Sequence, residues 1–290
     1  MSAPVAVAGL SGRTLRYAEV EPGERPVLRR LGAADFDLDV ERAVFAEGDA
    51  DALEVVSEAL ADGLAETEAS TLVLALHPSA TTTFFTPLPV GLEVDARDGQ
   101  LRQEAALLAD LAPTHVVRAR SRAVRTERTD AAGDLEWFQT VQVTEAVHGR
   151  LSHLADTLGA RYDLSDTTRA AARVAEIDGV TLVVGVYGRH TEVAVVRDGA
   201  FLFGSHGPST APADTAYFAL AALQQSGVAG PEVERLRVYG DDATEERLEL
   251  VVEFVGRERS FLNPLRPFAR SLAADPSELA SFGPVLGAAL

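Results

Sequence analysis

The stretch from Gly179 to Gly207, GVTLVVGVYGRHTEVAVVRDGAFLFGSHG, decides the fold of this chain. It contains three runs rich in β-branched and aromatic residues, which are typical of strands. Glycine and polar residues separate the runs, and the second break, Asp198-Gly199, has the sequence of a two-residue turn between antiparallel strands. The stretch therefore predicts a three-stranded antiparallel meander.

Similar runs open the chain, with Ser11-Gly12 as the turn signal after the first of them. These strand-like segments are residues 5–10, 14–21 and 27–40. A helical segment follows each block, at residues 49–68 and 213–227, and the first of these carries apolar residues at three- and four-residue spacing. A β-β-β-α unit that begins near residue 5 and again near residue 180 predicts a duplicated α/β fold.

The segment between the two blocks predicts a small inserted subdomain. Residues 81–86 are strand-like, and we expect Pro87-Leu88-Pro89 to break this strand. Helical and strand-like segments follow, with Trp137 expected in the core. Residues 163–177 are expected to form a helix with Ser165 or Asp166 as its N-cap. The predicted divisions are a first half at residues 1–160 with an insertion at about 82–144, and a second half at residues 161–290.

Composition excludes several classes of function. The 290 residues carry a formal net charge of −18, and all 26 basic residues are arginine. Without lysine there is no P-loop lysine and no Schiff base, and without cysteine there is no thiolate nucleophile, zinc–thiolate site or disulfide. The negative charge argues against binding to nucleic-acid backbones. Because no apolar run is long enough for a membrane helix and the first residues lack a basic signal region, we expect a cytoplasmic location.

Histidines and acidic residues form no recognisable motif. His148 and His153 are five residues apart and would point about 140° apart on a helix, whereas two ligands of one ion need a spacing of four. No Gly-x-Ser-x-Gly elbow accompanies the scattered histidines, which are His77, His115, His190 and His206. One face of an exposed edge strand is expected to carry Asp35, Asp37, Asp39 and Glu41. We therefore predict no metal site, while a catalytic carboxylate pair among the 44 acidic residues stays open.

Six segments follow one another in the order of a known family. In the best of them, LVVGVYGRHTEVAVVRDGAFLF at residues 182–203, a Gly-x-x-Thr turn precedes a strand and an Arg-Asp-Gly hairpin. The others are residues 5–20, 86–108, 144–176, 233–243 and the Asn-Pro tail at 261–268. By these segments the whole chain resembles the pilus assembly protein PilM and its actin-like relatives, including uncharacterised PilM-like proteins of Bacteroidetes-type bacteria. The resemblance implies a duplicated actin-like, ribonuclease-H-like α/β fold.

The resemblance also implies where a nucleotide would bind. In actin-like proteins, phosphate is held between the turns that follow the first strand of each half, so both turns should face one interdomain cleft. The candidate nucleotide-binding residues are Ser11, Gly12, Arg13, Gly188, Arg189, Thr191 and Gly240. Arg13 and Arg189 favour anion binding, because a guanidinium group pairs with phosphate through two hydrogen bonds.

The departures from the family argue against ATP hydrolysis. Actin-like ATPases carry an Asp before each phosphate turn, which holds hydrated Mg²⁺ and orients the attacking water. Both are missing here, near Gly9 and near Val186, and the third turn adds Asp241 and Asp242. A carboxylate about 5 Å from a phosphate opposes binding by roughly 3 kcal/mol at an effective dielectric constant near 20. We therefore expect a degenerate nucleotide cleft with no cofactor.

These features favour a cytoplasmic scaffold of pilus or secretion machinery over an enzyme. A competent ATP- and Mg-dependent ATPase or small-molecule kinase of the same superfamily is one alternative, and an unrelated α/β enzyme with paired carboxylates is another. The resemblance implies that an inner-membrane pilus or secretion protein docks a short peptide in a groove beside the insertion, which would hold the chain peripherally at that membrane. The expected anchoring pocket, or equally an ordinary core, comprises Phe84, Phe85, Leu88 and Val90. The oligomeric state is left open.

Overall fold

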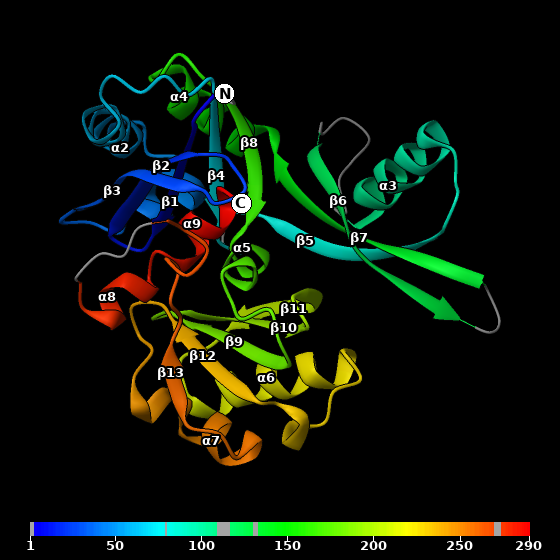
Figure 1. Ribbon diagram of the computed structural model, residues 1–290. Coiled ribbons are helices and arrows are strands. Elements are labelled where there is room, and N and C mark those ends of the chain that lie inside the picture. Colours follow the sequence, from blue (N-terminus) through cyan, green and yellow to red (C-terminus); the bar gives the residue numbers. More distant parts are fainter. Residues whose placement is uncertain (1–2, 79, 109–116, 130–132, 270–273) are drawn as a thin grey trace.

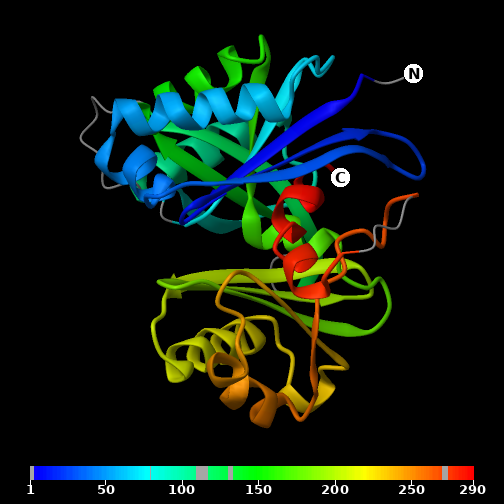
Figure 2. The same cartoon turned by 90° about the vertical axis from the view of Figure 1, so that its left-hand side faces the viewer.

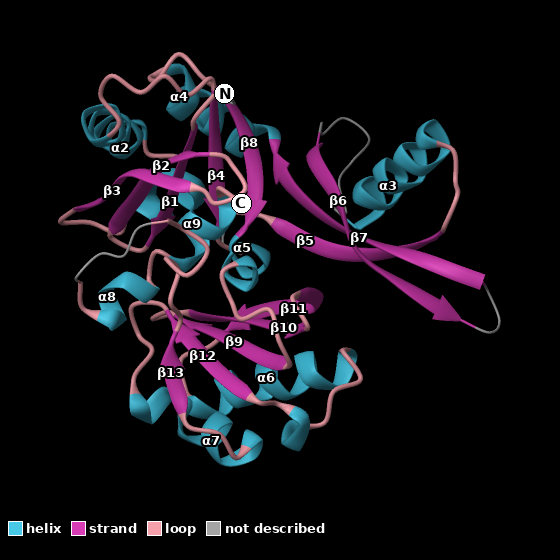
Figure 3. Ribbon diagram, viewed as in Figure 1, coloured by secondary structure: helices cyan, strands magenta, loops and turns pink. Residues whose placement is uncertain are grey.

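A computed structural model of the protein describes residues 3–78, 80–108, 117–129, 133–269 and 274–290. Two large sheets occupy the two ends of the molecule, and a third, smaller sheet projects from the side of the first (Figure 1). Figure 3 shows helices on the outer side of each large sheet, whereas others, among them those near the C-terminus, lie between the two sheets. Side chains from both halves line the space between the two large sheets.

The first large sheet has the strand order β3-β2-β1-β4-β8. Its strands are β1 (Val5–Ser11), β2 (Thr14–Glu21), β3 (Val27–Asp35), β4 (Thr71–Leu76) and β8 (Arg161–Asp166). The first three form an antiparallel meander, whereas β4 runs parallel to β1 and β8 runs parallel to β4. Because side chains alternate along a strand, Val7 and Ala8 of β1 enter separate cores on the two faces of this sheet.

Helices α2 and α4 cover the outer face of the first sheet. The helical segments on this side are α1 (Val40–Arg42), the π-helix η1 (Ala43–Glu47), α2 (Ala50–Gly63) and α4 (Glu145–Asp156). Val56 and Leu60 of α2 are buried in one core with Leu151 and Leu154 of α4. The apolar spacing of α2 therefore produces the stripe that the sequence predicts.

The second large sheet repeats this topology with the order β11-β10-β9-β12-β13. Its strands are β9 (Val180–Val186), β10 (His190–Arg197), β11 (Ala200–Pro208), β12 (Arg235–Tyr239) and β13 (Arg259–Phe261). β9 to β11 are an antiparallel meander, β12 is parallel to β9, and β13 is parallel to β12. The helical segments beside it are α6 (Pro212–Gln225), η2 (Gly230–Glu232) and α7 (Glu245–Val255). The matching orders confirm the predicted duplication.

Two local predictions are wrong in this part of the chain. Residues 163–166, included in the predicted helix 163–177, belong to β8 and pair in parallel with β4. The predicted N-cap Asp166 is confirmed, and helix α5 (Thr167–Arg173) begins directly after it. The first sheet therefore extends past residue 160, where the sequence placed the end of the first half. The acidic residues 35–41 also do not share one strand face, because β3 ends at Asp35 and Asp39 caps α1 instead.

The inserted subdomain is a three-stranded antiparallel sheet with one helix. Its elements are β5 (Thr82–Pro89), α3 (Val94–Leu108), β6 (Val117–Thr129) and β7 (Gly133–Thr144), and the strand order is β5-β7-β6. Leu88, Leu101 and Phe138 form its small core. Pro87 and Pro89 do not break β5 as predicted, because β5 is an edge strand and an edge tolerates proline where no hydrogen bond is needed.

The C-terminal segment returns to the junction between the halves, where the sequence predicts only an irregular tail. It forms α8 (Pro276–Ala280) and α9 (Gly283–Ala288), which lie between the two large sheets (Figure 2). Val285 and Leu286 of α9 enter the inner core of the first half with Ala170 of α5. Within the described ranges, none of the helices combines the length and apolar character that a membrane crossing requires.

Candidate functional site

A cavity of about 610 Å³ lies where the two halves meet. The β1–β2 turn contributes Ser11, Gly12 and Arg13 to its wall, and the β9–β10 turn contributes Gly188 and Arg189. Both turns therefore face one interdomain cleft, as expected. The other two candidate residues lie elsewhere: Thr191 is fully buried, with its hydroxyl 3.1 Å from that of Thr215, and Gly240 is packed against the β9 backbone.

The hydrogen-bond donors of the β1–β2 turn, called the first turn, already bind carboxylate groups of the protein. The backbone N–H of Gly12 donates to Oε2 of Glu41 at 2.8 Å, and Glu41 is buried at the start of α1. The Ser11 hydroxyl donates to Asp241 at 3.4 Å, and Arg16 donates to the same carboxylate at 2.6 Å. Glu41 and Asp241 thus place negative charge where the turn would otherwise offer donors to an anion.

The two arginines of the turns are also engaged. Arg13 donates to the backbone carbonyl oxygens of Phe36 at 3.0 Å and Asp37 at 2.6 Å. Arg189 lies 3.7 Å from a carboxylate oxygen of Asp39, and both arginine side chains are largely exposed. Neither guanidinium group is therefore held where the two could contact the same phosphate.

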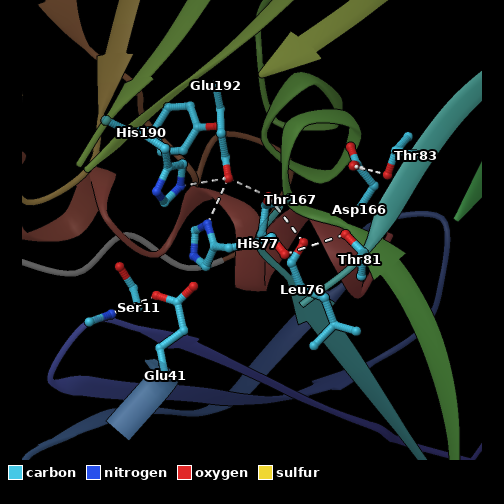
Figure 4. Close-up of polar contacts among 12 residues, drawn as sticks. Ser11, Glu41, Leu76, His77, Thr81, Thr83, Asp166, Thr167, His190 and Glu192 are labelled. Carbon is cyan, nitrogen blue, oxygen red and sulfur yellow. Dashed lines mark hydrogen bonds and ion pairs between the residues drawn. The ribbon is translucent and has the colours of Figure 1, made fainter. Parts of the chain in front are cut away.

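A buried polar network forms the floor of the cleft (Figure 4). Oε1 of Glu192 in β10 accepts the Thr167 hydroxyl at 2.7 Å and lies 2.6 Å from Nδ1 of His77 and 3.3 Å from Nε2 of His190. Its Oε2 accepts the Tyr239 hydroxyl at 2.8 Å. Because His77 follows β4 directly, the His77–Glu192 contact joins the first half to the second.

Burial and pairing shift the proton affinities in this network. Burial alone would raise the pKa of Glu192, but the positive charge of His77 and the hydrogen bonds from His190 and His77 hold this pKa well below its usual range. Burial likewise opposes the charge on His77, yet the neighbouring Glu192 raises the His77 pKa. Burial, then the negative charge of Glu192, raises the pKa of Tyr187 and Tyr239, so both phenols stay protonated. The result is a charged pair across the halves.

Sequence reasoning missed this network. His77 and Glu192 are separated by 115 positions, and the histidines form no spaced motif. The only signal is topological, because His77 directly follows β4 and His190 begins β10, next to the second turn. The histidine at position 115 lies outside the described residues.

A second cavity, of about 800 Å³, separates the inserted sheet from the second half. Phe85, Trp137 and Phe203 line it, and the Phe85 and Phe203 ring centroids are 5.2 Å apart. Trp137 is only half-buried, contrary to the core position predicted for it, because its indole N–H donates to Glu127 at 2.9 Å and Arg125 stacks on its ring at 4.8 Å.

The 800 Å³ cavity is called the groove from here on. The four residues expected to anchor a partner divide between this groove, the core of the subdomain and the surface. Phe85 lines the groove, and Phe84 is half-buried beside it in β5. Leu88 belongs to the core of the subdomain, whereas Val90 is 52% exposed. Of the four residues, Phe85 alone therefore lines the groove.

An arginine cluster lies farther along the same junction. It consists of Arg120 and Arg122 from β6 and Arg169 and Arg173 from α5. Burial, followed by the charges of Arg173 and Arg122, lowers the pKa of Arg169 to about 10. A cavity of about 220 Å³ lies between the groove and the arginine cluster. Phe85 and Phe203 line both this cavity and the groove. Gln139 and Asp166 line both this cavity and the pocket that holds the arginine cluster.

Comparison with known proteins supports the fold by structure alone. No protein-family model and no curated protein sequence matches the chain. The structure is similar to one from the PilM–PilN type IV pilus biogenesis complex, with a TM-score of 0.72, 15% identity and coverage of 98% of this chain and 97% of that one.

Two further solved structures agree. A protein from Bacteroides thetaiotaomicron with an actin-like ATPase fold and unknown function has a TM-score of 0.52, 11% identity and coverage of 90% and 91%. The ethanolamine utilization protein EutJ from Carboxydothermus hydrogenoformans has a TM-score of 0.50, 14% identity and coverage of 100% and 90%. The chain therefore has an actin-like ATPase fold, and over nearly its whole length this fold is PilM-like.

Proposed function

We propose that this protein is an actin-like scaffold that lacks ATP hydrolysis and acts in the assembly of a pilus or secretion machine. The observation that carries the proposal is the occupation of the first turn by carboxylates. The Gly12 N–H bonds to Glu41, and Ser11 and Arg16 bond to Asp241. Donors that are already paired with negative charge do not attract a triphosphate.

The residues of the cleft do not fit Mg-ATP. A phosphate group at the first turn would have to displace the carboxylate of Glu41 or lie close to it. At about 5 Å, one such contact costs roughly 3 kcal/mol at an effective dielectric constant near 20. A hydrogen bond from one hydroxyl contributes about 0.5–1.5 kcal/mol net, so it does not offset this repulsion.

One alternative within the same fold has a specific observation in its favour. Glu41 from the first half and Asp241 from the second both line the cleft, and carboxylates are the groups that would hold hydrated Mg²⁺ in a competent ATPase. Their present partners, a backbone amide and Arg16, favour the scaffold. The other alternative, an enzyme of an unrelated α/β fold, does not agree with the actin-like fold of this chain.

Calorimetric titration with Mg-ATP tests the proposal. We expect no ATP turnover and a dissociation constant weaker than about 1 mM, equivalent to less than about 4 kcal/mol of binding. Glu41→Gln removes one negative charge from the first turn and should tighten binding about tenfold or more. Glu58→Gln, the same change at an exposed position of α2 outside the cleft wall, is the control and should leave binding unchanged. Micromolar affinity in the unaltered protein would establish the ATPase alternative.

The partner we propose is an inner-membrane pilus or secretion protein that inserts a short peptide into the 800 Å³ groove. The groove has aromatic walls, and the similar structure from the PilM–PilN complex gives a precedent for a chain of this fold with a protein partner. A net charge of −18 would speed the encounter with a tail rich in Lys and Arg. Arg125 and Arg197, which line the groove, would repel the basic residues of that tail and keep them outside it. We accordingly propose a cytoplasmic protein held peripherally at the inner membrane.

Affinity capture from the membrane fraction at low salt, followed by direct binding, tests this partner. We expect enrichment of an inner-membrane protein, and a synthetic peptide of its cytoplasmic tail should change the fluorescence of Trp137, the single tryptophan of the chain. Phe203→Ala removes a wall of the groove and should weaken peptide binding about tenfold or more. Tyr217→Ala alters an exposed aromatic residue on α6 and is the control. Recovery of soluble metabolic enzymes alone would show that the scaffold proposal is mistaken.

A further inference from the structure

We propose that His77, His190 and Glu192 bind a divalent transition-metal ion, of the class represented by Zn²⁺ and Co²⁺, at the floor of the interdomain cleft. The site goes beyond the scaffold function and does not depend on it. It also differs from the Mg²⁺ that accompanies a nucleotide, because it uses imidazole nitrogens and lies behind the two turns instead of between them.

The geometry of the three side chains supports direct coordination. One ligand atom from each residue lies within 4.8 Å of the other two. At metal–ligand distances of about 2.0–2.1 Å, the ligand atoms of a tetrahedral site are roughly 3.3 Å apart. His190 Nε2 is already 3.3 Å from Glu192 Oε1, and His77 Nδ1 is 2.6 Å from it. The separations lie within 4.8 Å, so an ion would need shifts of up to about 1.5 Å, in which it replaces the proton shared by His77 and Glu192.

The ligand chemistry selects the class of ion. Two imidazole nitrogens and one carboxylate oxygen suit Zn²⁺, Co²⁺ and related transition metals, whereas Mg²⁺ and Ca²⁺ require mainly oxygen ligands. With three protein ligands, a fourth position remains for water, as in zinc sites that are open to solvent. The negative charge of the Glu192 carboxylate favours a cation in this cluster.

The surroundings provide the outer hydrogen bonds that a metal site needs. The Thr167 hydroxyl donates to Oε1 of Glu192 and the Tyr239 hydroxyl donates to Oε2, so the carboxylate is held in one orientation. Such outer contacts orient metal ligands and raise affinity. Glu192, Thr167 and Tyr239 are each at most 1% exposed, which gives the site a rigid base.

The site also has an entry path. His190 and Tyr187 line the 610 Å³ cleft, so an ion can reach His190 from solvent although Glu192 is fully buried. His77 belongs to the first half, whereas His190 and Glu192 belong to β10 of the second half. A bound ion would therefore link the two halves directly.

The test uses the whole 290-residue chain, treated with EDTA, freed of the chelator and then titrated with Co²⁺ and Zn²⁺. We expect the visible absorption of tetrahedral Co²⁺ at one equivalent and a Zn²⁺ dissociation constant below about 1 μM by calorimetry. His190→Gln should weaken Zn²⁺ binding about 100-fold and abolish the Co²⁺ spectrum. This variant is suitable because His190 is partly exposed, and circular dichroism would verify that it folds.

His153→Gln is the matched control. His153 and Glu54 also form a His–carboxylate pair, with 3.2 Å between Nε2 and Oε2, but this pair is exposed and has no third ligand among the described residues. We expect it to leave metal binding unchanged. Zn²⁺ affinity weaker than about 100 μM in the unaltered protein, or full binding by His190→Gln, would overturn the proposal. Neither outcome affects the tests of ATP or peptide binding, which use protein that has been freed of transition metals with EDTA and then transferred to buffer without EDTA.

Discussion

Glu192→Gln is expected to lower the free energy of unfolding by about 3–5 kcal/mol, because removing one charge from a buried ion pair leaves the other without compensation. The carboxylate is fully buried and accepts hydrogen bonds from Thr167 and Tyr239 in addition to its contact with His77. Glutamine preserves the volume of the side chain, so packing changes little. Denaturation by guanidinium chloride in the presence of EDTA measures the loss without any contribution from bound metal.

Glu54→Gln supplies the comparison for this experiment. It makes the same chemical change in the His153–Glu54 pair, whose side chains are 44% and 63% exposed. Solvent screens such a pair, so its loss should change the free energy of unfolding by less than about 1 kcal/mol. If the two variants were equally stable, the buried network between the halves would have no special part in holding them together.

Gly287→Ala is expected to destabilise the protein by about 3 kcal/mol through overpacking. A Cβ atom built on Gly287 would lie 1.7 Å from the carbonyl oxygen of Ala170, which is backbone and cannot move aside as a side chain could. Gly287 is in α9 and Ala170 in α5, so the two helices would have to separate at the junction of the halves. Thermal or guanidinium unfolding followed by circular dichroism measures this effect.

Gly149→Ala is the matched glycine substitution. Gly149 lies within helix α4, and a Cβ atom there meets nothing within 4 Å. Alanine has the higher helix propensity, so this variant should gain about 0.5–1 kcal/mol. A neutral result for Gly287→Ala alongside a gain for Gly149→Ala would mean that α5 and α9 pack more loosely than the structure describes.

The sequence predicts those parts of the fold that are determined locally. The two meanders were identifiable because short turns such as Asp198-Gly199 connect strands that pair with their neighbours in sequence. Residues 163–166 of β8 were included in a predicted helix because their conformation depends on parallel pairing with β4, about 90 residues earlier. Trp137 was placed in the core because an indole ring alone does not reveal that Arg125 and Glu127 will partner it near the surface.

The same distinction applies to the candidate site. Ser11, Gly12, Arg13, Gly188 and Arg189 could be named because the resemblance to actin-like proteins implies that these two hairpin turns face the cleft, and all five residues line it. The hydrogen-bond partner of Gly12 could not be named from the sequence. Glu41 was assigned to a strand, and it reaches the turn only as part of helix α1. His77 and Glu192 meet only after both halves have folded and docked, so no local pattern encodes their contact.

The prolines of the edge strand β5 restrict how another protein can attach to the inserted sheet. The N–H of Val90 points toward β7, where it donates to the carbonyl oxygen of Asp134, so Pro87 and Pro89 direct their nitrogens to the free edge. Two positions of that edge consequently offer no backbone donor. A strand from another chain cannot extend the sheet there by regular backbone pairing, which protects the subdomain from edge-to-edge aggregation. Recognition on this side must therefore use side chains, and its specificity will follow their shape and charge instead of a β-ladder.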